Sequence, residues 1–335
     1  RSVHGSYGHG YTLPAMAADV EAAQAARDEH IAEGREKQQT FQRIYQVWPG
    51  KILFPCGGRC ITAYPSGPAV CAWSFILTPC GFYCMFVGRL WTEWYPLVPI
   101  AALSIFVLTA SLLCLTCCSD PGIIPRRQLI IAAGLDKELK ELLGYDVLGT
   151  GQPTGQLDVD SSAMVPEELR KRGYKWCRTC KIIRPPRSSH CPDCDQCVMR
   201  YDHHCPFVNN CIGQRNYHFF VGFVTSVVCL ALVVLPGLVW GILTPLTSGR
   251  TDQASEEEGV SGILIGVIVG VAGLAGIALL ALLVFLGYHL FLIMSGMTTK
   301  EHLGKSSRAS NIAEEPTLFA ARGPRLFDPR VFVQI

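Results

Sequence analysis

The sequence predicts an all-α polytopic membrane protein with four transmembrane helices and a cytosolic cysteine-rich domain between the second and third of them. Three observations lead to this expectation. Of the 335 residues, 49% are hydrophobic and only 17% are charged, which is too apolar for an ordinary soluble domain. Four long apolar runs occur along the chain, in two pairs. Between the pairs, seven of the 16 cysteines and three of the nine histidines crowd into residues 177–211.

Each apolar run is close to the ~20 residues that an α-helix needs to cross a bilayer. The first two, Ala69–Gly88 and Tyr95–Cys117, are separated only by a short turn and should form a hairpin. The second pair is His218–Leu246 and Ser261–Met297. The fourth run is longer than a membrane requires, so it is expected to tilt or to extend beyond the bilayer near His289.

The distribution of positive charge predicts which side each loop occupies. Residues 118–217 hold 14 of the 29 lysines and arginines, whereas the two short loops hold one each, Arg89 and Arg250. Because positively charged loops stay on the cytoplasmic side, both termini and the central loop are expected to face the cytosol. Golgi, ER and plasma membrane are equally compatible with this pattern.

The expected organisation has six parts. They are a cytosolic N-terminal arm (1–68), a transmembrane hairpin (69–117), a juxtamembrane segment with a linker (118–176), a cysteine-rich domain (177–217), transmembrane helices 3 and 4 (218–297) and a cytosolic C-terminal tail (298–335). Residues 147–166 are rich in Gly, Ser, Pro and Asp, which is typical of a flexible linker.

The cysteine-rich segment contains ten strong candidates for metal ligands. Cys177–Cys180 and Cys191–Cys194 both have the Cys-x-x-Cys spacing that lets two thiolates reach one tetrahedral ion. Two zinc ions would use eight ligands and leave two residues over. The ten candidates are Cys177, Cys180, His190, Cys191, Cys194, Cys197, His203, His204, Cys205 and Cys211.

The leftover pair of greatest chemical interest is His203 with Cys205, because Asp202 lies beside them. A free thiol with a pKa near ~8.5 is mostly protonated at neutral pH, and an adjacent imidazole that accepts its proton raises the reactive fraction. An aspartate can orient and charge-stabilise that imidazole. The alternative is that all ten residues are ligands or buried fillers of a module that only binds partners.

The segment Cys177–Phe220 resembles, without gaps, the cysteine-rich domain of the DHHC family of protein S-acyltransferases, whose naming tetrad is Asp202-His203-His204-Cys205 here. The similarity extends to the family's DPG motif at Asp120–Gly122 and its TTxE motif at Thr298–Glu301. The stretch Arg43–Gly50 is similar to plant-type members.

The resemblance implies transfer of a palmitoyl or similar fatty acyl group from acyl-CoA to protein thiols, with Cys205 as nucleophile, His203 as general base and Asp202 as its orienter. It also implies Thr299 as a hydrogen-bond partner of Asp202, and Arg184 and Arg187 as contacts of the coenzyme A phosphates. Two structural Zn²⁺ are implied, one held by Cys177, Cys180, His190 and Cys197, the other by Cys191, Cys194, His204 and Cys211.

The chain departs from the family pattern in two places. Phe207 stands where the family usually has Trp, but it keeps an aromatic side chain, so activity is expected to survive. The C-terminal tail lacks a clear match to the usual Asn-containing motif, with Asn311 as the candidate Asn.

The expected partners are membrane lipid and cytosolic or membrane-associated proteins with acceptor cysteines. Nucleic acid is not expected, because apolar runs flank the cysteine cluster on both sides. A non-enzymatic zinc-dependent membrane adaptor is the alternative function. A transporter is disfavoured because the third and fourth runs carry few ionisable side chains, His218 and His289 near their ends.

Overall fold

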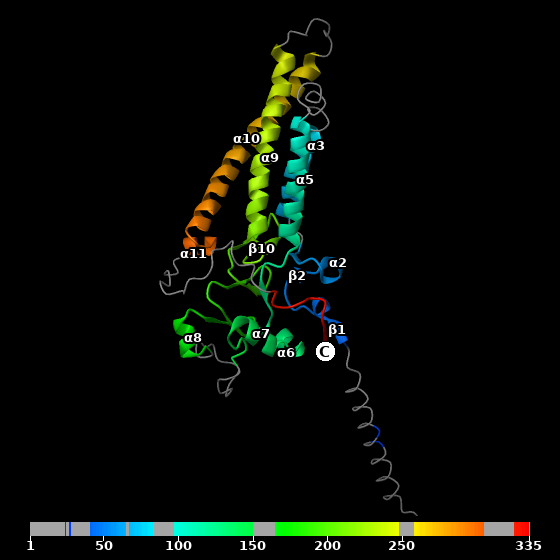
Figure 1. Cartoon of the computed structure of the whole chain (residues 1–335). Helices are drawn as coiled ribbons and strands as arrows, with labels where there is room; N and C mark the ends of the chain where they lie inside the picture. The colour runs from blue at the N-terminus through cyan, green and yellow to red at the C-terminus, as the bar shows by residue number, and fades with distance from the viewer. Residues whose placement is uncertain are drawn as a thin grey trace, which may run out of the picture.

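A bundle of long helices stands on a smaller unit of short strands and helices (Figure 1). The computed structural model describes residues 24, 27, 41–64, 67–83, 97–149, 165–247, 258–304 and 325–334. The long helices are α3 (Gly67–Phe82), α5 (Leu97–Cys118), α9 (Tyr217–Thr247) and α10 (Glu258–Met294).

Three of the described helices contain a segment long and apolar enough to cross a membrane, namely Leu97–Cys118, Tyr217–Gly237 and Ala272–Met294. They correspond to the second, third and fourth predicted runs. The first predicted run appears as α3, which has 16 residues and is apolar but shorter than a full span. Its expected last residues, 84–88, lie outside the described part of the chain.

The long helices lack a polar face, so their outer surfaces remain apolar. Leu108 of α5 is 54% exposed and Leu274 of α10 is 70% exposed, as expected for side chains that contact lipid rather than water. Helix α9 is central, because it packs against α5 and α10 and also touches α3.

The prediction that the protein is all-α is wrong, because the described residues outside the long helices include five small sheets. Four are two-stranded, pairing β1 (Phe41–Arg43) with β11 (Phe332–Gln334), β2 (Ile52–Leu53) with β3 (Thr62–Ala63), β5 (Lys175–Cys177) with β6 (Ile182–Arg184), and β9 (His203–Cys205) with β10 (Asn210–Ile212). The fifth places β8 (Gln196–Val198) between β4 (Ile123–Ile124) and β7 (Ser189–Cys191). Strands of two or three residues are too short to show an alternating pattern in the sequence.

The remaining helices are short and surround these strands. They are η1 (Ile44–Gln46), α2 (Pro55–Gly58), α6 (Arg127–Ala132), α7 (Asp136–Leu143), α8 (Glu167–Lys171) and α11 (Thr299–Leu303).

One hydrophobic core holds this smaller unit together, and it draws on residues well outside 177–217. Ile44 from the N-terminal arm, Ile123 after α5 and Phe327 near the C-terminus are all buried in it with the cysteines. Trp48 stacks on Phe327 with ring centroids 4.9 Å apart. The C-terminal segment therefore packs on the arm, whereas Asn311 lies outside the described residues.

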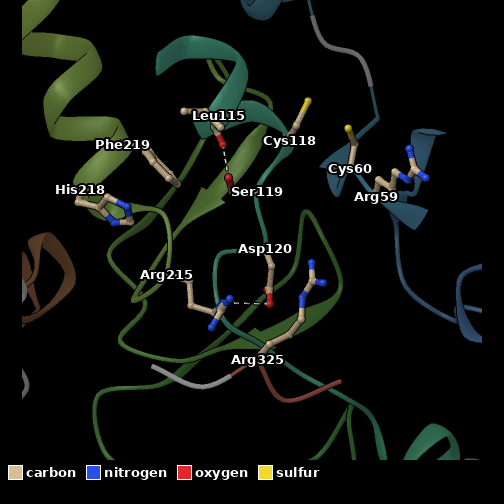
Figure 2. A pocket seen from close by; sticks show the side chains of 10 residues that line it. All are labelled: Arg59, Cys60, Leu115, Cys118, Ser119, Asp120, Arg215, His218, Phe219 and Arg325. Carbon is tan, nitrogen blue, oxygen red and sulfur yellow. Dashed lines mark hydrogen bonds and ion pairs between the residues drawn. The ribbon is translucent and has the colours of Figure 1, made fainter. Parts of the chain in front are cut away.

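The end of α5 is fixed to this unit by polar contacts. Asp120 accepts hydrogen bonds from the amides of Gly122 (2.8 Å) and Ile123 (2.9 Å) and pairs with Arg215 at 3.3 Å. Gly122 has a φ of +103°, a conformation that favours glycine. The Asp120–Arg215 pair lines a pocket of about 390 Å³ beside the end of α5 and the start of α9, which Arg59, Cys60 and Arg325 also line (Figure 2).

Candidate active site and metal clusters

Two clusters of three cysteines and one histidine lie in the described part of the cysteine-rich unit. In each cluster the four ligand atoms lie within 4.8 Å of one another. The first contains Cys177, Cys180, His190 and Cys197, and the second contains Cys191, Cys194, His204 and Cys211.

Strand register explains why the two sets interleave along the chain. His190 is directly opposite Cys197 in the β7–β8 pair, and His204 is directly opposite Cys211 in the β9–β10 pair. Directly opposed residues in an antiparallel pair project from the same face, so each histidine reaches the same site as its opposed cysteine. The Cys-x-x-Cys turns supply the other two ligands. Lys181 and Asp195 have positive φ values of 55° and 52°, which shows how tightly the chain turns there.

The ligand atoms are spaced as tetrahedral zinc requires. Zn–S bonds of ~2.3 Å and Zn–N bonds of ~2.0 Å place neighbouring ligand atoms about 3.5–3.8 Å apart. Nδ1 of His190 lies 3.5 Å from Sγ of Cys180 and 3.9 Å from Sγ of Cys197. In the second cluster, Nδ1 of His204 lies 3.4 Å from Sγ of Cys194 and 3.8 Å from Sγ of Cys211. The residues therefore fit a closed four-ligand metal site at each position.

One thiol in each cluster is driven toward the thiolate form. Hydrogen bonds from Cys180 and Cys197 lower the pKa of Cys177, and hydrogen bonds from Cys194 and Cys211 lower the pKa of Cys191. The donors show the converse, with the pKa of Cys180 and that of Cys194 each raised to about 12. Each cluster thus favours one thiolate, whose charge a cation would neutralise.

The other face of β9 carries the residues without a place in these clusters. Successive side chains of a strand project to opposite faces, so His203 and Cys205 share the face that His204 does not use. Nδ1 of His203 lies 2.6 Å from Oδ2 of Asp202, whose side chain is fully buried. The amide of Thr299 donates to Oδ1 of Asp202 and its hydroxyl donates to Oδ2, both at 2.7 Å.

These contacts set the charges of the pair. Burial alone would raise the pKa of Asp202, but hydrogen bonds from His203 and Thr299 outweigh it and lower that pKa. Burial alone would lower the pKa of His203, but hydrogen bonds to Asp202 and to the sulfur of Cys205 raise it to about 9. The imidazole, placed between a carboxylate and a thiol, therefore binds a proton more tightly than a free imidazole does.

Cys205 lies where the cysteine-rich unit meets the long helices. It is 7% exposed and belongs to an apolar cluster with Ile76 of α3, Leu113 of α5 and Val221 of α9, against which Leu286 of α10 packs. The thiol thus lies between the polar Asp202–His203 pair and an apolar region to which all four long helices contribute. Phe207, two residues later, is 55% exposed.

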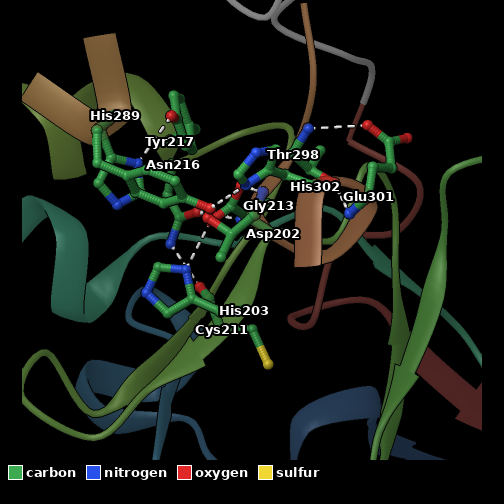
Figure 3. A network of polar contacts seen from close by, with 12 residues as sticks. Asp202, His203, Cys211, Gly213, Asn216, Tyr217, His289, Thr298, Glu301 and His302 are labelled. Atoms are coloured by element: carbon green, nitrogen blue, oxygen red, sulfur yellow. Dashed lines mark hydrogen bonds and ion pairs between the residues drawn. The ribbon is translucent and has the colours of Figure 1, made fainter. Parts of the chain in front are cut away.

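The two arginines expected at the mouth of the site have different surroundings. Arg187 forms a two-pronged ion pair with Glu301, at 2.7 Å and 2.9 Å, and donates to the carbonyl of Gly296 at 2.8 Å. Its side chain is only 10% exposed. Glu301 also closes the start of α11, where it accepts from the amide of Thr298 at 2.8 Å (Figure 3).

Arg184 is half-buried and lies in a cationic group with Lys175 and Lys300. Burial, together with the charges of Arg184 and Lys175, lowers the pKa of Lys300. Nζ of Lys300 contacts the hydroxyl of Ser189 and lies 5.2 Å from the centroid of the Tyr201 ring.

Sequence reasoning missed several polar residues that support the site. Asn210 is fully buried, and its side-chain nitrogen lies within hydrogen-bonding distance of four carbonyls, those of Ile61 (3.1 Å), Thr116 (3.3 Å), Cys117 (3.1 Å) and Ser119 (2.9 Å). Its two N–H groups are shared among these acceptors, of which those of Thr116 and Cys117 are carbonyls in the last turn of α5 that have no partner within the helix. His289 and Tyr217 form a buried hydrogen bond beside His203. Only His289 gave a signal in the sequence, as an ionisable residue in an apolar run.

Comparison with known proteins gives a consistent result. The family model described as DHHC palmitoyltransferase matches residues 170–306. The human protein named Palmitoyltransferase ZDHHC18 is 32% identical over 313 residues, covering 88% of this chain and 76% of that protein. Human Palmitoyltransferase ZDHHC9 is 32% identical over 282 residues, covering 82% and 72%. The zebrafish (Danio rerio) protein of that name is 31% identical, covering 82% and 68%.

Proposed function

The chain belongs to the DHHC palmitoyltransferase family, and from that premise we propose that its protein-cysteine S-palmitoyltransferase activity proceeds through an acyl-enzyme on Cys205. The observation that carries this proposal is the Asp202–His203–Cys205 arrangement at the junction with the apolar helices. Family membership does not favour the alternative of a non-enzymatic adaptor.

The proposed reaction has two half-reactions. His203 accepts the proton of Cys205 while Sγ attacks the thioester carbonyl of acyl-CoA, and the C–S bond to coenzyme A breaks. The proton passes from His203 to the coenzyme A thiolate, which leaves as the free thiol. In the second half-reaction, a protein thiol gives its proton to His203 and attacks the carbonyl of the Cys205 thioester. The bond to Sγ of Cys205 breaks, the acylated protein leaves, and the proton passes from His203 to Cys205. Asp202 orients the ring throughout, and the kinetics are ping-pong.

The acyl chain is proposed to lie among the long helices. Burying about fourteen methylenes at ~0.8 kcal/mol each supplies roughly 11 kcal/mol before ordering costs. The apolar neighbours of Cys205, which come from α3, α5, α9 and α10, support this placement. An enzyme that draws its binding energy from an acyl chain gains by working at a membrane.

The two Cys₃His clusters are proposed to hold one structural Zn²⁺ each. A closed site of four protein ligands leaves no position for a reactive water, so the ions would stabilise the fold rather than take part in the chemistry. The register of β9 makes this relevant to catalysis, because the contact of His204 with its cluster sets the direction of His203.

Coenzyme A is proposed to contact the cationic group of Arg184, Lys175 and Lys300, because phosphates favour clustered Lys and Arg. The contact of Arg187 with a phosphate stays a prediction. Since Arg187 already binds Glu301 with two hydrogen bonds, it would have to share that carboxylate with the ligand.

Four membrane spans with a cytosolic active site remain our proposal for the topology. The Lys and Arg distribution supports it, and α3 would be the part of the first span nearest the cytosol. Sealed vesicles test it with one protease-cleavable tag within residues 147–166 and another between Thr251 and Gly259. The first tag should be cut only from the cytosolic side and the second only from the other side. Cleavage of both from one side would contradict the four-span arrangement.

Labelling tests the catalytic assignment. Detergent-purified protein incubated with labelled palmitoyl-CoA should acquire a hydroxylamine-sensitive label, and Cys205→Ser should not. Cys117→Ser is the matched control, because Cys117 packs against the same apolar cluster. A label that persists in Cys205→Ser would refute the assignment, and unlabelled wild type would restore the adaptor alternative.

A further inference from the structure

His289 is a buried ionisable residue in an apolar helix, and the proposed reaction does not use it. It lies within the candidate span Ala272–Met294 and is 2% exposed. A polar group in such surroundings is costly unless it has a partner, and ionisable residues within membrane spans usually have a function.

The partner of His289 is Tyr217, the first residue of α9. The hydroxyl of Tyr217 lies 3.0 Å from Nδ1 of His289, and Tyr217 is itself only 1% exposed. The pair thus links the start of α9, just after the cysteine-rich segment, to the last part of α10 (Figure 3). Neither group can turn to water when the other is removed.

The ring of His203 lies against this link. Its centroid is 6.2 Å from that of His289 and 5.3 Å from that of Phe220, and Phe220 in turn lies 5.1 Å from His289. Phe285 also packs on His289, with ring centroids 4.6 Å apart. His203 thus contacts Asp202 at Nδ1 and lies beside one ring of α9 and one ring of α10.

The chain after α10 also contacts Asp202, the partner of His203. A tight turn follows α10, with Gly296 at a φ of +64°, and Thr299 then binds both oxygens of Asp202. The segment from α10 to α11 therefore contacts the Asp202–His203 unit at two points, through His289 and through Thr299. A change in how α10 sits on α9 would move both.

We infer that His289 and Tyr217 form a positioning pair that fixes α10 against α9 and so holds the His203 ring in line with Cys205. The inference rests on the proposed roles of His203 and Cys205 and extends them to two residues that no part of that mechanism requires. A pair that only satisfied two buried polar groups would affect stability but would not act selectively on the acylation step.

The test is the rate of self-acylation over a series of palmitoyl-CoA concentrations for Tyr217→Phe, His289→Phe and His289→Asn. Tyr217→Phe and His289→Phe should each lower the maximal rate about tenfold, with the half-saturating concentration unchanged within about twofold. His289→Asn places a hydrogen-bonding atom near the position of Nδ1 and should recover most of the rate. Metal content should stay at the wild-type value in all three.

His302→Phe is the matched control. Nδ1 of His302 lies 3.0 Å from the hydroxyl of Tyr288, the same distance as in the buried pair, but this second pair is exposed. His302→Phe should therefore react at the wild-type rate. The inference is overturned if His289→Phe also reacts at the wild-type rate, if only the half-saturating concentration changes, or if His289→Asn is no better than His289→Phe. Labelled Cys205→Ser would instead refute the catalytic assignment itself.

Discussion

Thr299 binds both carboxylate oxygens of Asp202, with its amide 2.7 Å from Oδ1 and its hydroxyl 2.7 Å from Oδ2. Oδ2 also lies 2.6 Å from Nδ1 of His203. Thr299 thus holds both oxygens of the carboxylate that contacts the imidazole. The first residue of α11 thereby orients the Asp202 carboxylate toward His203, although the two segments are far apart in the sequence.

Thr299→Val should lower the self-acylation rate about tenfold, because it removes one hydrogen bond to a buried charge. Thr299→Ser keeps the hydroxyl and should retain most of the rate. The measurement is single-turnover labelling with palmitoyl-CoA, with metal content as a check on folding. Equal rates for the Val and Ser variants would contradict a role for the hydroxyl.

His203→Ala should keep both metal ions yet slow self-acylation by ~10²- to 10⁴-fold, the usual contribution of a positioned general base. Raising the pH should restore part of the rate, because hydroxide in solution then takes the place of the missing base. Metal analysis is run beside the kinetics. Loss of one ion from His203→Ala would mean that His203 is a ligand and that its assignment must be exchanged with that of His204.

Metal analysis of the wild type should find about two zinc ions per chain, since each closed site takes one. Cys194→Ser should lose metal and unfold at a lower temperature, because metal binding at such sites is coupled to folding. Cys205→Ser should retain both ions. A content near one in active protein would argue against two sites.

Arg184→Gln should raise the half-saturating concentration of palmitoyl-CoA several-fold while leaving the maximal rate nearly unchanged, because it removes one charge-assisted contact to a phosphate. The difference from wild type should shrink at high salt. Lys137→Gln on α7 is the control, since it removes an exposed cation outside the Arg184, Lys175 and Lys300 group. Identical behaviour of the two variants would place the phosphates elsewhere.

Asn210→Ala should lower the free energy of unfolding by about 1–3 kcal/mol, because it leaves buried carbonyls at the end of α5 without a donor. The change is measured by thermal unfolding in detergent. Gln128→Ala on α6 is the control, because Gln128 is exposed. If the two variants unfolded at the same temperature, Asn210 would not be fastening α5 to the cysteine-rich unit.

Composition and spacing were sufficient for much of this architecture. Apolar runs locate α5, α9 and α10, because a helix in lipid needs an apolar surface over its whole length. Ligand arithmetic singled out His203 and Cys205 because ten candidates exceed what two tetrahedral ions use. The alternation of side chains along β9 supplies the physical reason, since neighbours such as His203 and His204 must face opposite ways.

Other features depend on tertiary contacts that leave no local pattern. The partition of cysteines follows from opposed strands, such as His190 with Cys197, and spacing alone could not provide it. Arg187 was expected to meet a ligand, but Glu301, distant in the sequence, lies against its guanidinium. The short strands could not be predicted, because two or three residues are too few to show the two-residue alternation of a strand.

The pairing of β1 with β11 has a consequence for the order in which the protein is assembled. Phe41 lies opposite Gln334, and the amide of Ile44 donates to the carbonyl of Val331 at 2.9 Å. The N-terminal arm therefore completes its contacts with residues that are synthesised after α3, α5, α9 and α10. During synthesis, Trp48 has no Phe327 ring to stack on until the helices have already been made. Until then the arm presents an unpaired strand edge and apolar side chains, which are features that chaperones recognise. A chain truncated before Leu326 would keep that surface exposed. Quality control could then degrade the truncated chain even though its metal clusters and long helices were intact.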